Sequence, residues 1–173
     1  ADRVEGNLLA AAQEIDKLAL LATGGTLDAG RMQALVADSA RYDVFRLVDA
    51  ALNGQGAQAV RMLAGLRAEG EAVPALMGMV VMELQRMAAL ARVKARGGNL
   101  GAEFKAQRIW DAKEAAYRRA LERHPAARWE RFVALAGEVD RVAKGRGAGD
   151  EWLLLERLLL AVADPRALPL LAA

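Results

Sequence analysis

The feature that most constrains the fold of this chain is the spacing of its apolar residues, which recur every three or four positions over most of its length. This spacing places them on one face of an α-helix, whereas a half-buried strand would alternate apolar and polar residues. Helical stripes cover residues 44–51, 59–66, 77–91, 110–121, 129–143 and 155–162. Strand signals are nearly absent, since aromatic residues make up only 5% of the chain. The sequence therefore predicts an all-α fold, a helical bundle of about eight or nine helices.

Turn-forming residues mark the ends of these stripes. The glycine-containing breaks are Asn53-Gly54, Gly70 and Gly97-Gly98. Pro74 is compatible with the first turn of a helix, and Asp150 is expected to cap the last helix, which Asp164-Pro165 then ends. Because that helix is apolar on most sides, we expect it to be the central, buried one. Trp129 and Trp152 lie in apolar stripes and are predicted core residues.

The composition fits a globular protein with a hydrophobic core. The chain has 173 residues, of which 54% are hydrophobic and 27% charged, so one or two domains are expected. It has no cysteine, which excludes disulfides and thiolate metal sites and fits the reducing environment of the cytoplasm. No signal peptide is visible, and the most apolar stretch, residues 152–163, falls short of the about 20 residues that span a bilayer. No membrane association is expected.

The charges are unevenly distributed. Residues 1–40 hold three Lys or Arg against six Asp or Glu, whereas residues 86–123 hold ten against four. The second segment therefore contains the positive excess of the chain, which can attract a polyanion. It also contains Trp110, between Arg108 and Lys113, and an exposed indole can stack on an unpaired base. The alternatives are a solvated basic helix face and a Trp110 side chain buried in the bundle.

No combination of residues predicts a catalytic site. Ser39 lacks the strand–turn–helix context of a nucleophile and is expected to cap a helix. His124 precedes Pro125 and is expected to be partly exposed and structurally minor, without partner ligands for a metal. Residues 145–149 are glycine-rich but lack the Lys-Ser/Thr pair of a phosphate-binding loop, so they are interpreted as a flexible connection between helices. We expect no catalytic residue, cofactor or metal, and leave enzyme activity uncertain.

Two segments carry a resemblance to a known family. Residues 5–18 place Asn7, a potential cap, ahead of a helical face, and residues 39–50 read Ser-Ala-Arg-Tyr-Asp-Val-Phe-Arg-Leu-Val-Asp-Ala. In their order and spacing, with Trp110 and the leucine-rich last helix further on, they resemble the delta-subunit family of the bacterial DNA polymerase III clamp loader. The resemblance covers nearly the whole chain.

The resemblance implies two domains. Residues 1–39 are similar to the last part of the helical lid of an AAA+-like module, with a hinge at 38–41, and residues 40–173 are similar to the helical collar domain. Ala1 would then lie inside the lid, and the chain would correspond to the C-terminal half of its relatives, without the N-terminal module. Residues 5–10 contain no arginine where ATP-hydrolysing relatives present a sensor, so no ATP chemistry is implied. The chain itself would be non-catalytic within a polymerase complex, which is a nucleotidyltransferase.

The resemblance also implies partners. The collar would join this chain to the gamma/tau and delta-prime subunits for DNA replication, and the sliding clamp would be contacted only through the N-terminal module. A primer–template junction would lie close to the collar. The predicted DNA-contact residues are Arg92, Arg96, Lys105, Arg108 and Lys113 for phosphates and Trp110 for a base. The competing hypotheses are a stand-alone helical adaptor that binds a protein or RNA, and an enzyme that uses carboxylates in a helical cavity.

Overall fold

The computed structural model describes residues 29–109 and 111–172, and every regular element in these ranges is helical. The elements are α2 (Ala29–Leu52), α3 (Gly56–Ala68), α4 (Val73–Ala95), α5 (Leu100–Ala106), α6 (Asp111–Arg123), α7 (Ala126–Ala143), α8 (Glu151–Ala163) and the 3₁₀ helix η1 (Pro165–Leu171). The predicted all-α helical fold is confirmed. Each predicted stripe lies within one helix in the described part of the chain, except that Trp110, the first residue of the stripe 110–121, lies outside the described residues.

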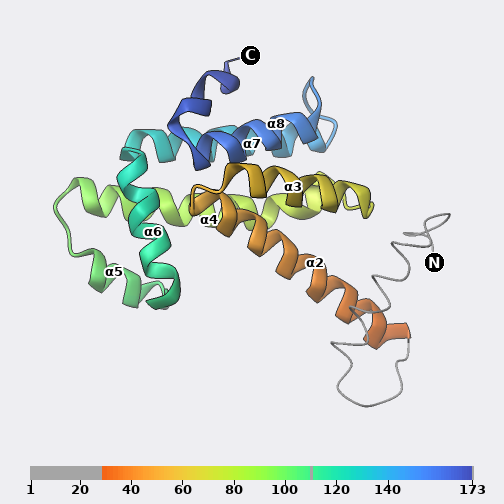
Figure 1. Cartoon of the computed structure of the whole chain (residues 1–173), viewed down its shortest axis with the longest axis horizontal. Helices are drawn as coiled ribbons and strands as arrows, with labels where there is room; N and C mark the ends of the chain where they lie inside the picture. The colour runs from red at the N-terminus through yellow and green to blue at the C-terminus, as the bar shows by residue number, and fades with distance from the viewer. Residues whose placement is uncertain (1–28, 110, 173) are drawn as a thin grey trace.

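The helices form a bundle around α4. This helix contacts α2, α5, α6, α7 and α8, and α7 packs along most of its length. The remaining helices complete the bundle, because α3 packs on α2 and α8, and η1 folds back on α8. Figure 1 shows α5 and α6 together at one end of α4, with α6 crossing it, while α3, α7 and α8 lie alongside it. The α5–α6 pair therefore forms a lobe at one end of the bundle.

The predicted helix ends are confirmed. Asp150 precedes α8, and its Oδ1 accepts hydrogen bonds from the backbone nitrogens of Trp152 (2.9 Å) and Leu153 (3.0 Å). These amides have no partner within the helix, so the carboxylate supplies it, and their bonds lower the pKa of Asp150. Just after the C-terminal end of α2, Gly54 adopts a φ of 80°, a conformation that is costly for residues with a Cβ. Pro74 lies in the first turn of α4 as expected.

Two helices share the centre of the core. Leu155, Leu158 and Leu159 of α8 are buried, as predicted, but α4 is buried along one whole face as well. By length and composition α4 could cross a membrane, yet half of its most apolar window is covered by the rest of the bundle. Among the described residues it is the one helix with this property, which here reflects its central place in the core.

The two tryptophans differ. Trp129 is fully buried, as predicted. Trp152 packs against the core but is only partly buried, so its predicted core position is confirmed in part. The guanidinium of Arg67 lies 5.5 Å from the centre of the Trp152 ring, where the face of an indole attracts a cation. Because Trp152 lies in the first turn of α8, one face of its ring remains at the surface, where it contacts Arg67.

The predicted break at residues 38–41 is wrong. The backbone of α2 is helical without interruption from Ala29 to Leu52, so Ser39 lies inside a helix and does not cap one. Serine costs little inside a helix, and the periodic apolar residues that follow favour its continuation. The boundary between residues 39 and 40 as a division of domains stays a prediction, because residues 1–28 lie outside the described part.

Two short elements were not predicted from the sequence. Seven-residue α5 is too short to display a full apolar stripe, although Asn99 caps it by accepting a hydrogen bond from the backbone nitrogen of Ala102 at 3.1 Å. The 3₁₀ helix η1 begins at Pro165, where a helix was expected only to end. Proline is compatible with the first position of a helix, so Pro165 can both end α8 and begin η1. Asp164 caps η1 by accepting a hydrogen bond from the backbone nitrogen of Arg166.

His124 is buried, which contradicts the expectation of a partly exposed, minor residue. Its Nε2 lies 3.0 Å from the carbonyl oxygen of Val162, near the end of α8, and its ring contacts the rings of Trp129 and Phe132 edge-on. The neighbouring Arg123 donates hydrogen bonds to the same carbonyl (3.1 Å) and to that of Leu52 at the end of α2 (3.2 Å). The α6–α7 junction therefore satisfies the terminal carbonyls of two other helices.

The substitution Leu159→Ala should lower the free energy of unfolding by about 2–5 kcal/mol, because it removes a buried side chain from the centre of the core. Leu153→Ala on the same helix is the matched control, since 44% of Leu153 is exposed, and it should cost less than about 0.5 kcal/mol. Urea denaturation measures both values. Equal costs for the two substitutions would contradict the packing of α8.

The stability of the protein should depend on pH through His124. Burial lowers the pKa of His124 below its ordinary value of about 6.5, against the opposing effect of its bond to Val162. The unfolded chain therefore binds a proton before the folded one does, and the free energy of unfolding should fall as the pH drops below about 6.5.

Denaturation at about pH 8 and about pH 5.5 measures this dependence. His124→Gln retains a donor for the Val162 carbonyl but cannot titrate, so it should lose less stability between these two pH values than the parent does. An equal loss in both proteins would assign the dependence to other groups.

Candidate nucleic-acid interface and buried polar network

Four of the predicted phosphate-contacting residues are exposed and lie near the C-terminal ends of α4 and α5. Arg92 and Arg96 end α4, Lys105 lies in the last turn of α5, and Arg108 follows α5 with a φ of 53°. Arg92 makes a long ion pair with Glu130 of α7, at 3.4 Å. Cations at helix C-termini also stabilise the helix dipole, so a structural role accounts for part of this pattern. Trp110 lies outside the described residues.

Lys113 differs from the other four, because its side chain points into the bundle. Its Nζ lies 3.3 Å from Asp49 Oδ1 and 3.3 Å from the centre of the Phe45 ring, both on α2. Only 22% of the Lys113 side chain is exposed. A phosphate contact would require this ion pair to open. The predicted role of Lys113 in binding DNA stays a prediction, while the structure shows that it joins α6 to α2.

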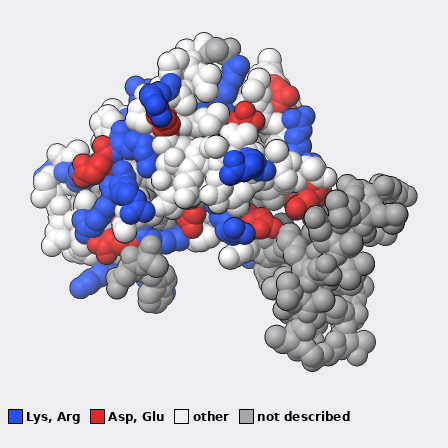
Figure 2. Space-filling view, in the orientation of Figure 1, with Lys and Arg blue, Asp and Glu red and all other residues white. Residues whose placement is uncertain are grey.

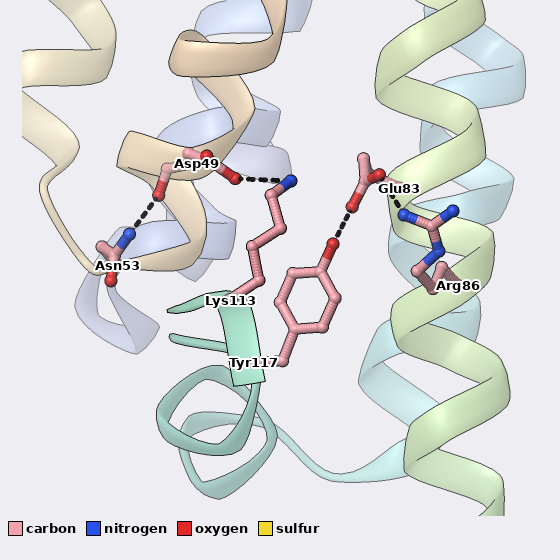
Figure 3. A network of polar contacts seen from close by, with 6 residues as sticks. All are labelled: Asp49, Asn53, Glu83, Arg86, Lys113 and Tyr117. Atoms are coloured by element: carbon pink, nitrogen blue, oxygen red, sulfur yellow. Dashed lines mark hydrogen bonds and ion pairs between the residues drawn. The ribbon is translucent and has the colours of Figure 1, made fainter. Parts of the chain in front are cut away.

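A buried carboxylate lies beside Lys113 and joins α6 to α4. Glu83 of α4 is only 2% exposed. The hydroxyl of Tyr117, on α6, donates a hydrogen bond to Glu83 Oε2, and Arg86 donates one to Oε1 (Figure 3). A buried carboxylate needs such partners, since an isolated charge is very costly in an apolar core. Glu83 therefore ties the orientation of α6 to that of α4.

The same network reaches the end of α2. Asn53 donates from Nδ2 to the carbonyl oxygen of Asp49 at 2.9 Å, and Figure 3 shows Asp49, Lys113 and Tyr117 side by side between the helices. Burial raises the pKa of the Asp49 carboxyl, and the charge of Lys113 opposes this effect. Burial also raises the pKa of the Tyr117 hydroxyl, as do the hydrogen bond and charge of Glu83. The hydroxyl therefore remains a protonated donor to Glu83.

This network can orient helices, but its groups do not form a reactive centre. Its two carboxylates are each paired with a cation, and the described residues contain no group of three or more His, Asp or Glu placed to hold a metal ion. The glycine-rich stretch 145–149 joins α7 to α8, as predicted for a connection between helices.

Glu83 and Tyr117 were not predicted as a pair. The signal was present, because Glu83 lies on the apolar stripe of α4, three residues after Val80 and four before Met87. A charged residue at such a position requires buried partners. Its partner Tyr117 could not be identified, since the sequence does not reveal that α6 crosses α4 at this level.

Comparison with known proteins shows which kind of protein the chain is similar to. No protein-family model matches the chain. Two curated relatives from bacteria are subunits of DNA polymerase III. Both are delta subunits: that of Escherichia coli K12 is 33% identical over 90% of this chain, and that of Haemophilus influenzae Rd is 25% identical over 91%. The resemblance to the delta-subunit family is confirmed, and the chain spans about half the length of the curated relatives it matches.

Removal of the Tyr117 hydroxyl should destabilise the bundle. Tyr117→Phe keeps the buried ring but leaves Glu83 without one of its donors, so the free energy of unfolding should fall by about 1–3 kcal/mol. Tyr42→Phe removes the same group from a tyrosine that is 62% exposed and should cost less than about 0.5 kcal/mol. Chemical denaturation measures both.

A double-mutant cycle with Glu83→Gln tests the pairing itself. The cost of Tyr117→Phe should shrink once the carboxylate has been replaced by an uncharged amide. Costs that simply add would show that the two side chains stabilise the protein independently.

Proposed function

We propose that this chain is part of a delta subunit of a DNA polymerase III clamp loader, and that its helical bundle is the collar domain that joins delta to the gamma/tau and delta-prime subunits. The observation that carries the proposal is 33% identity to the E. coli delta subunit over 90% of the chain. This similarity also favours a loader subunit over a stand-alone helical adaptor. We also propose a cytoplasmic location, because a loader of this kind works in DNA replication.

Surface features support a role in assembly. The exposed large apolar residues of the described region include Leu153 of α8, at 44%, and Leu170 of η1, at 40%. Apolar side chains that remain exposed in one chain are candidates for contacts with another. The two elements that carry them, α8 and η1, pack on each other. We assign the subunit contact to the side of the bundle that these two elements form. The sliding clamp would be engaged by an N-terminal module outside this sequence.

The DNA contacts form the second part of the proposal. Arg92, Arg96, Lys105 and Arg108 would bind phosphates of the primer–template junction, and Trp110 would stack on an unpaired base. The exposure of the four cations, near the C-terminal ends of α4 and α5, supports this assignment. Lys113 would join them only after its release from Asp49.

Mixing the chain with the gamma/tau and delta-prime subunits of the same organism should give a complex of defined mass. Leu153→Glu and Leu170→Glu should each weaken its formation, because a charge replaces an apolar contact. Met82→Glu is the matched control, since Met82 of α4 is 43% exposed and lies outside the assigned side. Size-exclusion chromatography with light scattering measures the complex. No association, or equal effects of all three substitutions, would contradict the assigned collar role.

A further inference from the structure

Arginine side chains gather over α6 and toward the start of η1. Figure 2 shows this concentration of positive charge on the face of the molecule that carries α6. The arginines of these elements are Arg118, Arg119, Arg123 and Arg166. Two of them have acidic partners, because Arg118 pairs with Glu114 and Arg166 pairs with Asp164. Arg119 and Arg123 are held in a different way.

Arg119 is held by a neutral group. Its Nη2 donates a hydrogen bond to Asn53 Oδ1 at 2.8 Å. The amide nitrogen of Asn53 is bound to the carbonyl oxygen of Asp49, so the amide oxygen is fixed toward Arg119. Arg119 itself is exposed. Its guanidinium is therefore oriented by the end of α2, but its charge is not neutralised by this contact.

Arg123 is also held by neutral groups. Two of its five N–H donors bond the carbonyl oxygens of Val162 and Leu52. Gly54 allows this approach, since a Cβ at that position would lie 3.0 Å from Arg123 Nη2. The half-buried guanidinium is fixed against the ends of α2 and α8, and it retains donors that these two carbonyls do not use.

The two guanidinium groups repel each other. Arg119 and Arg123 are four residues apart on α6, a spacing at which like charges destabilise a helix. Burial lowers the pKa of Arg123, the charge of Arg119 lowers it further, and the charge of Asp164 opposes both. Asp164 is itself held by Arg166, which binds both of its carboxylate oxygens. A bound anion would relieve this repulsion, and guanidinium groups bind phosphate with paired hydrogen bonds.

We propose that Arg119 and Arg123 form a binding site for the phosphates of a nucleic-acid backbone. An acidic peptide is the competing polyanion, but protein partners are usually anchored by apolar or aromatic contacts. The exposed large apolar residues of the described region are Tyr42, Met82, Leu153 and Leu170, and none lies on α6. The site therefore offers charge and hydrogen bonds, which recognition of a nucleic-acid backbone requires, and it lacks an apolar anchor. The choice of nucleic acid as the polyanion rests on the proposed loader function.

Fluorescence anisotropy of the whole chain with a labelled single strand and with the matching duplex tests this site, between about 50 and 200 mM salt. Arg119→Gln should weaken binding several-fold and reduce the slope of affinity against salt by about one unit. Arg61→Gln is the matched control, because it removes the same charge from an exposed position on α3. Its salt slope should stay unchanged. Equal losses of affinity in both variants would overturn the site, because they would show that DNA is attracted by the overall positive charge of the chain.

Competition identifies the source of the anion. Polyglutamate at equal charge should displace the single strand less effectively than unlabelled DNA does, and inorganic pyrophosphate should displace it only weakly. Equal displacement by polyglutamate would overturn the assignment to nucleic acid, and complete displacement by pyrophosphate would assign the site to small phosphates.

Subunit assembly separates this inference from the proposed collar role. Arg119→Gln should assemble with the loader subunits as the parent does. Loss of assembly in this variant would overturn the phosphate site and identify Arg119 as a subunit contact. If the parent chain does not assemble but Arg119→Gln still weakens DNA binding relative to Arg61→Gln, the collar role fails and the phosphate site stands.

Discussion

The burial of α4 is the constraint on which the rest of the bundle depends. This helix is apolar enough to enter a membrane, and here α2, α6, α7 and α8 cover it. Each Leu, Met or Val that it buries completely contributes about 1.5–3 kcal/mol relative to exposure. One member of its buried face is Glu83, whose carboxylate cannot be covered by apolar side chains alone. Arg86 of α4 itself supplies one donor, and Tyr117 of α6, the helix that crosses α4 at this level, supplies the other.

This requirement links the core to the charged surface. Tyr117 and Lys113 fix α6 against α4 and α2 from its inner face, and Arg119 and Arg123 bind the ends of α2 and α8 from other positions on the same helix. The arginines are thus held on a helix whose orientation is set by buried polar contacts. Rigid positions of this kind favour recognition of an anion, because little side-chain entropy is lost when it binds.

The sequence predicted the large elements because their apolar residues repeat with the helical period and their ends carry Asp150, glycine or proline. It did not predict α5, which is shorter than a full stripe, or the passage of α2 through residues 38–41, where Ser39 is expected to cap a helix. His124 is buried although partial exposure was expected, and Trp152 is partly exposed although a core position was expected. Burial of these two residues depends on how the α6–α7 junction and the start of α8 meet the bundle. Local sequence does not specify that arrangement.

The candidate site was predicted only in part, for a similar reason. The positive excess of residues 86–123 is visible in the sequence, but the pairing that neutralises some of these charges is not. Lys113 pairs with Asp49, which lies on α2 and far away in the sequence, whereas Arg119 meets an uncharged asparagine. Only the packing of α6 against α2 distinguishes the two residues.

Hydrogen–deuterium exchange of the chain, alone and with the gamma/tau and delta-prime subunits, tests the proposed collar role most directly. The account predicts that α4 and α8 exchange most slowly in the free chain, because they share the centre of the core. It also predicts that the partners add protection at the start of α8 and in η1, where Leu153 and Leu170 are exposed. Unchanged exchange in these two segments, or new protection confined to other helices, would contradict the account.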